Sequence, residues 1–341
     1  MNRSLALLVA ATWLVVPVTP ALAAEWTVEF VAVPTGVADL FDDQGRTIAL
    51  TRSGVFFRIG AAPDGRVIVD RLGSYERPSG PRRADMLPDG LVALGAGEIS
   101  EAYLVGPTSR YRHGVIGDAI EASGLRIQTN GGDILDYRLP TDSVFEDIVP
   151  RLHDVDGDGQ DEIVVVRSYI DTGSAVAVFG LREGRLALIA EAAPIGRPSR
   201  WLNPVGVADF DGDGQVEIAV VKTPHIGGVL QLYEIEGGTL KDDHSARGFS
   251  NHFIGSRDLF LSRVADIDGD GTVDIVLPSA DRGSLRVVSF AGGRFKDLGE
   301  TPLPARVQTR MLSIDVGPGA FAFGLADGAL AVVRPRGTGK P

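Results

Sequence analysis

Three short segments of the sequence carry the same arrangement of acidic and glycine residues. Their first residues are 55 and 57 positions apart, and the segments align without gaps. Asp at positions 1, 3 and 5 of a tight turn directs three carboxylates into one concavity, and glycines at positions 4 and 6 let the chain curl. The segments are Asp154-Val-Asp156-Gly-Asp158-Gly-Gln160-Asp-Glu162, Asp209-Phe-Asp211-Gly-Asp213-Gly-Gln215-Val-Glu217 and Asp266-Ile-Asp268-Gly-Asp270-Gly-Thr272-Val-Asp274.

Carboxylates gathered in this way favour a bound divalent cation. Two carboxylates ~4 Å apart repel by on the order of 4 kcal/mol at an effective dielectric constant of 20, and a cation reverses the sign of that interaction. A flexible set of oxygen ligands favours Ca²⁺ over Mg²⁺ or Zn²⁺. We expect about three Ca²⁺ ions, held by the acids at positions 1, 3, 5 and 9 and by a carbonyl at position 7. These ligands are Asp154, Asp156, Asp158, Gln160, Glu162, Asp209, Asp211, Asp213, Gln215, Glu217, Asp266, Asp268, Asp270, Thr272 and Asp274.

Short runs of β-branched and apolar residues flank the three segments. Ile163–Val166, Ile218–Val221 and Ile275–Leu277 follow them directly, and further strands come after glycine-containing turns. Each unit is therefore a four-stranded meander of roughly 50 residues, which is the size of a β-propeller blade. Glycine supplies 43 of the 341 residues, about 13% against a usual ~7%, as many tight turns require.

Weaker copies of this unit determine the expected number of blades. Leu91–Leu94 with Glu101–Val105 is assigned to one blade, and Leu125–Thr129 with Ile134–Leu139 to another. We therefore expect an all-β fold with a seven-bladed propeller. Six blades are the alternative, because Arg110–Arg126 is difficult to assign and is a candidate insertion.

The propeller is expected to form a single domain over residues 24–335. Its first strand, Trp26–Val33, has no blade of its own. Pairing beside the last strands would close the ring and remove exposed sheet edges. Residues 336–341 are expected to form a disordered tail.

The three acidic segments resemble the calcium loops of FG-GAP repeats, also called VCBS-type repeats, which are known from the β-propeller of integrin α subunits. The resemblance covers residues ~148–290 well and the rest of the chain weakly. It implies that each loop joins the innermost strand of a blade to the next strand and holds a structural Ca²⁺. It also implies that the protein is a platform for interactions.

The first 23 residues have the pattern of a secretory signal peptide. A positive start at Met1–Arg3 precedes the apolar run Leu5–Val16, and Ala21-Leu22-Ala23 supplies the small residues of a cleavage site. The apolar run is shorter than the ~20 residues that a membrane-spanning helix needs. We expect an exported protein, periplasmic or secreted, with no membrane insertion after cleavage.

Charge and composition narrow the range of partners. The net charge is −12, which disfavours nucleic acid as a partner because such binding depends on Lys and Arg. The acids at positions 1, 3, 5 and 9 of the three loops number twelve, and without them the chain has 33 acidic and 33 basic side chains. The acidity therefore belongs to the expected metal face, and an anionic partner stays admissible elsewhere. The chain has no cysteine, which excludes disulfides and thiolate chemistry.

The face opposite the loops is the expected ligand face, because its connections are long and carry Arg, His and Trp. Arginine can bind an anion through two hydrogen bonds, and Trp201 can offer a stacking surface. The weaker units add further basic residues to this face, namely Arg82, Arg83, Arg112 and His113. The candidate ligand-binding residues are Arg200, Trp201, Asn203, His225, Asn251, His252, Arg257, Asp258 and Arg282.

These features favour a non-enzymatic binding or scaffold module whose ligand is a protein or a glycan, anionic glycans included. No nucleophile elbow, H-E-x-x-H motif or P-loop is present in the sequence. The alternative is a carbohydrate-active enzyme, a polysaccharide lyase or hydrolase, that uses the Arg and His residues of the same face. A third hypothesis is a structural subunit of an envelope complex.

Overall fold

The computed structural model describes residues 26–335. Every regular element in this range is a β-strand, and all strand pairs are antiparallel. The prediction of an all-β fold is confirmed. Residues 26–335 contain no helix of the length and apolar character needed to cross a membrane. The predicted signal segment, 1–23, and the predicted tail, 336–341, lie outside the described residues.

Within the described residues the strands form six sets of four. Two sets come from the first part of the chain and consist of β2 (Val37–Asp43), β3 (Arg46–Thr51), β4 (Phe56–Ala61) and β5 (Val67–Arg71), and of β6 (Ala93–Leu94), β7 (Ile99–Thr108), β8 (Glu121–Thr129) and β9 (Ile134–Arg138).

The next three sets each carry one of the acidic loops between their first two strands. They consist of β11 (Arg151–His153), β12 (Glu162–Tyr169), β13 (Gly173–Arg182) and β14 (Arg185–Glu191), of β15 (Leu202–Ala208), β16 (Glu217–Lys222), β17 (Val229–Glu236) and β18 (Thr239–Arg247), and of β19 (Arg263–Ala265), β20 (Asp274–Pro278), β21 (Ser284–Ser289) and β22 (Lys296–Pro302).

The last set combines both ends of the described chain. It consists of β23 (Leu312–Ser313), β24 (Phe321–Gly324), β25 (Leu330–Pro335) and β1 (Trp26–Val31). β1 pairs with β25 along its whole length, from Trp26 opposite Pro335 to Val31 opposite Leu330. The first strand therefore lies beside the last one, as the sequence predicted.

The sequence predicted seven sets as the first choice, whereas the described strands form six. The difference arises at β7 and β8, because the sequence pattern predicts them in separate blades. These two strands pair over most of their length, and β6 and β9 complete the same set. The short strand β10 (Ser143–Phe145) pairs with both β8 and β12 and joins two sets into one nine-stranded sheet.

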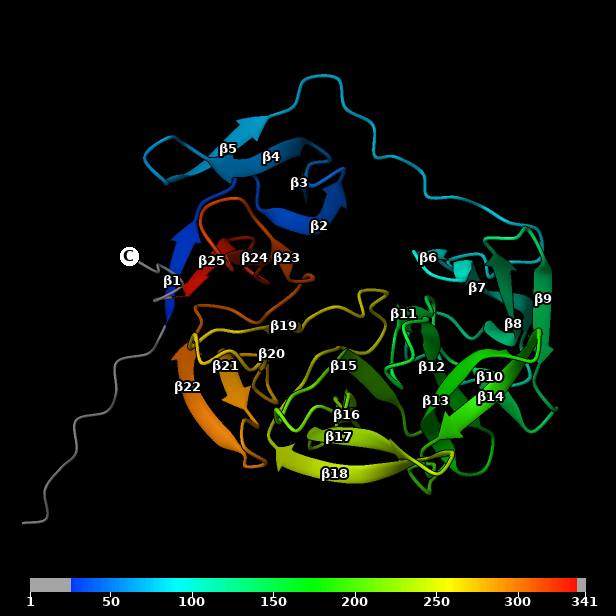
Figure 1. Ribbon diagram of the computed structural model, residues 1–341. Helices are drawn as coiled ribbons and strands as arrows, with labels where there is room; N and C mark the ends of the chain where they lie inside the picture. The colour runs from blue at the N-terminus through cyan, green and yellow to red at the C-terminus, as the bar shows by residue number, and fades with distance from the viewer. Residues whose placement is uncertain (1–25, 336–341) are drawn as a thin grey trace, which may run out of the picture.

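Figure 1 shows the six sets arranged about a common centre. The first strand of each four, β2, β6, β11, β15, β19 or β23, lies nearest this centre, and the fourth lies at the periphery. Between β5 and β6 the chain runs along the outside as an irregular segment, residues 72–92 (Figure 1).

The apolar core lies between neighbouring sets. Five clusters of buried side chains each join two adjacent sets, and Val166, Val220 and Trp201 belong to the cluster between β11–β14 and β15–β18. Strands β12, β16 and β20 are buried on both faces, which explains their unbroken apolar sequences. Among the described residues no such cluster joins β2–β5 to β6–β9.

Segment 72–92 covers the faces of these two sets instead. Tyr75 packs against Phe56 and Phe41 of the first set, with ring centroids 5.0 and 6.4 Å apart. Met86 packs with Tyr103 of the second set. Side chains of this irregular segment therefore contact aromatic residues of both sets.

Two phenylalanines of the last set test how much packing between sets contributes to stability. Phe323 is fully buried against the β19–β22 set, whereas Phe30 is 45% exposed. Phe323→Ala should lower the free energy of unfolding by about 3–5 kcal/mol through lost burial and a residual cavity. Phe30→Ala should cost less than about 1 kcal/mol. Urea unfolding measures both, and equal losses would contradict this account of the core.

Candidate metal loops and ligand-facing cavities

The three acidic segments form loops between the first and second strands of consecutive sets. We call them the first loop (154–162), the second loop (209–217) and the third loop (266–274). In each loop the acid at position 9 is the first residue of the following strand. Both glycines adopt the left-handed conformation, with φ of +82° at Gly212 and +92° at Gly214 in the second loop. A side chain at either position would strain the turn.

The main chain of each loop is folded around the Asp at position 1. Asp209 accepts hydrogen bonds from the N–H groups of Gly212 (2.7 Å) and Gly214 (3.0 Å). The corresponding bonds recur in the first and third loops. The acid at position 9 accepts an N–H from position 2, as Glu217 does from Phe210 at 2.7 Å. The repeated sequence therefore folds into a repeated local structure.

The carboxylates of each loop converge on one point. In the second loop, oxygens of Asp209, Asp211, Asp213 and Glu217 all lie within 4.8 Å of one another. Three acids converge in each of the other two loops, at positions 1, 3 and 9, while Asp158 and Asp270 stay outside these groups. Donor sets made only of oxygen suit Ca²⁺.

Burial of the ninth residue supports this fit. Asp274 is fully buried, and its Oδ1 atom has no hydrogen-bond partner within the described chain. Burial, and then the neighbouring Asp carboxylates, raise the pKa of Asp274 to about 6 and that of Glu217 to about 7. Keeping these groups charged is therefore costly without a cation. Ca²⁺ bound among the carboxylates would offset that cost.

The side chains at position 7 point to other partners. Gln160 Oε1 accepts the N–H of Glu98 at 3.1 Å, and Gln215 Nε2 donates to Asp213 at 3.2 Å. Ligation by position 7 through its main-chain carbonyl stays a prediction.

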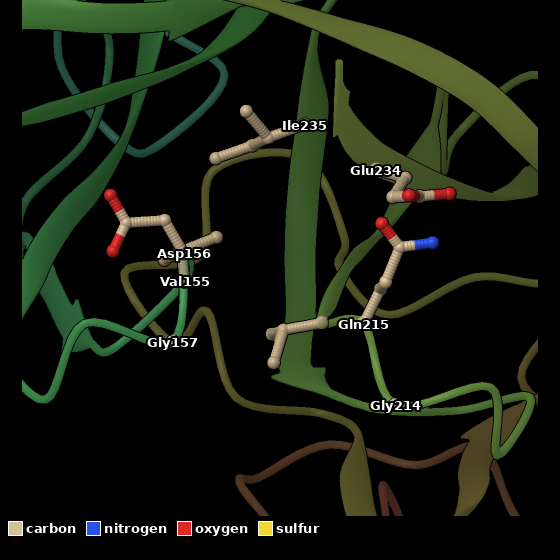
Figure 2. A pocket seen from close by; sticks show the side chains of 8 residues that line it. Val155, Asp156, Gly157, Gly214, Gln215, Glu234 and Ile235 are labelled. Carbon is tan, nitrogen blue, oxygen red and sulfur yellow. The ribbon is translucent and has the colours of Figure 1, made fainter.

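Neighbouring loops lie on the same face of the molecule. A cavity of about 190 Å³ separates the first and second loops and is lined by Asp156, Gly157, Gln215 and Glu234, among others. Figure 2 shows Asp156 on one side of this cavity and Gln215 on the other.

The predicted ligand residues lie toward the opposite ends of the same strands. β16 starts at Glu217 of the second loop and runs six residues, roughly 20 Å, toward His225. His225 lines a cavity of about 280 Å³, which we call the histidine cavity. Its other lining residues include His113, Ser199, Arg200, Trp201, Thr223 and Ile254.

Two further cavities are lined by most of the remaining predicted residues. One, of about 300 Å³, is lined by His225, His252 and Arg282. Another, of about 390 Å³, is lined by Arg257 and Asp258. Seven of the nine predicted residues thus line one of these three cavities.

Asn203 and Asn251 line none of the three. Both are completely buried, Asn203 on β15 and Asn251 in the segment between β18 and β19. Asn203 Nδ2 donates to the carbonyl of Leu259 at 2.9 Å, and Asn251 Nδ2 donates to the carbonyl of Asn203 at 3.2 Å. These amides connect the main chain of β15 to the segment between β18 and β19, which places them in the core.

Trp201 and Arg257 also have partners within the protein. Trp201 is 2% exposed, and its indole N–H donates to the carbonyl of Glu146 at 3.0 Å. Arg257 donates to Asp89 (2.7 Å) and Asp118 (2.8 Å), so two carboxylates already pair with its guanidinium. Trp201 therefore forms a wall of the histidine cavity, and Arg257 connects distant loops.

His225 and His252 form a hydrogen-bonded chain. His252 Nε2 lies 2.9 Å from the carbonyl of Ser256 and must donate to it, so Nδ1 of His252 accepts from Nε2 of His225 at 2.9 Å. Burial lowers the pKa of His225 to about 4 and that of His252 to about 3. Both rings are therefore neutral at pH 7, and His225 Nδ1 keeps a lone pair.

Glu146 is a site residue that the sequence analysis missed. It is fully buried, and its carboxylate lies 2.7 Å from Nδ1 of His113, at the edge of the histidine cavity. Ser168 also donates to it. The available signal was the pair Glu146-Asp147 inside an otherwise apolar stretch, Val144–Val149.

Glu121 is another buried acid without a predicted role. It is fully buried, and neither carboxylate oxygen has a hydrogen-bond partner within the described chain. Burial, with smaller contributions from Glu146, Asp118 and other acids, raises its pKa to about 9. Glu121 is therefore protonated in the folded protein at pH 7.

This protonation makes stability depend on pH. Unfolding at neutral pH releases the Glu121 proton, because the pKa falls from about 9 to its ordinary value of 4.5. Its contribution to stability should therefore decline as pH rises from 4.5 to 9. Glu121→Gln should be more stable than wild type at pH 8, by on the order of 5 kcal/mol, and equally stable near pH 4. Urea unfolding at several pH values measures this, with the exposed Glu76→Gln as control. An unchanged pH dependence would contradict a buried neutral Glu121.

Comparison with known proteins identifies part of the chain. Residues 154–220 match the family of FG-GAP-like repeats. This range contains the first and second loops in full, and the third loop repeats their hydrogen bonds beyond it. The curated proteins contain no match to this chain. The chain therefore contains an FG-GAP-like repeat sequence at residues 154–220.

Proposed function

We propose that the protein is an exported calcium-binding β-propeller that acts as a non-enzymatic interaction module. The convergence of carboxylates in three consecutive loops carries this proposal. Six four-stranded sets about one centre, with the first strand paired to the last, support a six-bladed propeller. The signal-like sequence at 1–23 supports export to the periplasm or the medium.

Calcium has a structural role in this proposal. Each loop joins the innermost strand of a set to the strand that is buried on both faces, so an ion there fixes the start of that strand. Loops of the extracellular kind bind Ca²⁺ at ~0.1–1 mM. Millimolar Ca²⁺ would then stabilise the fold by on the order of 1–2 kcal/mol per loop through mass action.

The calcium proposal predicts a stoichiometry. Calorimetric titration should show about three Ca²⁺ ions per chain, and EGTA should lower the melting temperature. Asp209→Asn should remove one ion, because Asp209 is the residue around which the second loop folds. Asp64→Asn, an exposed acid outside the loops, serves as control. Absence of binding heat together with an unchanged melting temperature would refute a calcium role.

The histidine cavity is the proposed ligand site, for an acidic protein segment or an acidic glycan. Arg200 lines it and, among the described residues, has no acidic partner within 4.0 Å, unlike Arg257. A guanidinium without a carboxylate partner is suited to bind an anion. Nucleic acid is not proposed, because the chain is expected to be exported.

Arg200 provides the test of this site. Screening acidic and neutral oligosaccharides should reveal binding of the acidic ones, and Arg200→Gln should weaken that binding at least tenfold. Arg197→Gln, an exposed arginine of the same loop outside the cavity, should bind like wild type. Equal affinities of the two variants would contradict the proposal that the histidine cavity is the ligand site.

The second candidate is the carbohydrate-active enzyme, which the pair of His113 and Glu146 favours. A buried carboxylate that accepts Nδ1–H orients the imidazole and leaves Nε2 for proton transfer. Incubation with polyuronates distinguishes the two functions. Release of unsaturated or shortened products, lost in His113→Gln, would establish the enzyme, whereas binding without turnover favours the module.

A further inference from the structure

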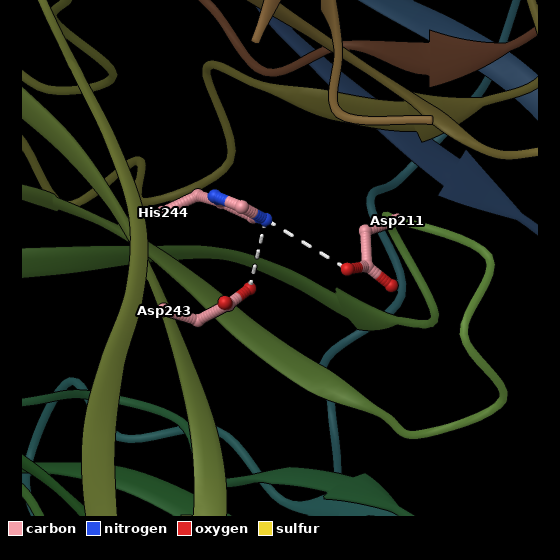
Figure 3. Close-up of side chains that lie close together, drawn as sticks. All are labelled: Asp211, Asp243 and His244. Atoms are coloured by element: carbon pink, nitrogen blue, oxygen red, sulfur yellow. Dashed lines mark ion pairs between the residues drawn. The ribbon is translucent and has the colours of Figure 1, made fainter. Parts of the chain in front are cut away.

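A second group of donor atoms adjoins the second loop. Asp243 and His244 lie on β18, the outermost strand of the set that carries this loop. His244 Nε2 is 3.7 Å from Asp211 Oδ2 and 3.4 Å from Asp243 Oδ2. Figure 3 shows the imidazole nitrogen directed at both carboxylates. The group combines one nitrogen and two oxygen donors from two separate elements.

A β-bulge brings Asp243 and His244 to this position. The register between β17 and β18 shifts at Leu232, and both residues lie opposite that single position. Neighbouring residues of a regular strand point to opposite faces, and a bulge redirects them. Gln231 Nε2 supports the bulge by donating to the carbonyl of His244 at 2.9 Å.

The same shift occurs in the other two loop-bearing sets. It lies at Ile189 on β14 and at Leu298 on β22, where the extra residue is apolar. The bulge is therefore general to these sets, whereas the donor side chains belong to one of them.

The separations in the group are unusual for hydrogen bonds. They exceed the 2.7–3.2 Å of an N–H···O bond. His244 Nε2 is buried and has no hydrogen-bond partner within the described chain. Two ligands bound tetrahedrally at ~2.0–2.1 Å from one metal ion lie about 3.4 Å apart. The observed distances are close to that value.

Packing and hydrogen bonds hold the donors in place. The His244 ring stacks on buried Phe290, with centroids 5.5 Å apart and planes at 19°. The two carboxylate oxygens of Asp211 have different neighbours. Oδ1 accepts the N–H of Asp213 within the loop, and Oδ2 faces His244. Asp211 can therefore serve both sites.

We propose that Asp211, Asp243 and His244 bind one Zn²⁺ ion beside the second calcium loop. Imidazole and carboxylate together suit zinc, whereas the loop offers only oxygen. Three protein ligands leave the fourth position to water or to a group of a bound partner. The side chains of His244 and Asp243 are each 25% exposed, so the ion can enter from solvent. This inference goes beyond the proposed function and requires no occupant of the histidine cavity.

The test is a zinc titration of the full chain with Ca²⁺ held at saturation. One Zn²⁺ should bind, and Co²⁺ in its place should give the visible absorption of a tetrahedral site. His244→Gln and Asp243→Asn should each weaken Zn²⁺ binding at least tenfold while the Ca²⁺ stoichiometry stays the same. His153→Gln, a histidine directly before the first loop, serves as the matched control and should bind like wild type.

Two results would overturn the proposal. One is unchanged zinc affinity in His244→Gln with a melting temperature equal to that of wild type. The other is zinc binding that displaces a Ca²⁺ ion, because zinc would then occupy the loop itself. A protein that binds zinc through His244 but no Ca²⁺ would support the zinc site and contradict the calcium proposal, so the two failures are distinguishable.

Discussion

Burial of the second strand of each loop-bearing set on both faces is the constraint on which the rest of the structure depends. A strand such as β16 can be apolar on both sides only if a neighbouring sheet covers each side. Each such set therefore needs a neighbouring sheet on both faces, and Figure 1 shows the sets side by side about a common centre. The two ends of each buried strand then become two faces with different chemistry. The acids of the loops collect at one end, and His, Arg and Trp collect near the other.

The repeated loops were predictable because their information is local. Position 1, the two glycines and position 9 lie within nine residues, and their hydrogen bonds connect those same residues. The apolar runs that follow them were predictable for the same reason. The pairing of Trp26–Val31 with the last strand followed from the general cost of exposed sheet edges.

Features that depend on distant segments were not predictable from this sequence. The prediction that β7 and β8 belong to separate sets is wrong. The irregular residues 109–120 separate the two strands in the sequence, and no local pattern indicates that they pair. Glu146 and His113 are 33 positions apart, and neither local context indicates the other. Asn203 is of a residue type that often binds ligands, yet its amide donates to carbonyls of the segment between β18 and β19. Polar type alone does not distinguish a solvent-facing amide from one that connects buried main chains.

The irregular segment 72–92 spans the junction between β2–β5 and β6–β9, and we call this junction the seam. At the other junctions an apolar core joins neighbouring sheets. Here no shared core joins the two described sheets, and the segment contacts each of them through a few packed side chains and through ion pairs such as Arg77 with Asp39 and Arg83 with Glu101. Such contacts contribute less to stability than a packed core, so we expect local opening to begin at this junction. The described residues begin at β1 and end at β25, which pair with each other in another set. A circular permutant with new termini in segment 72–92 would therefore keep every sheet intact, and the seam would become the ends of the chain.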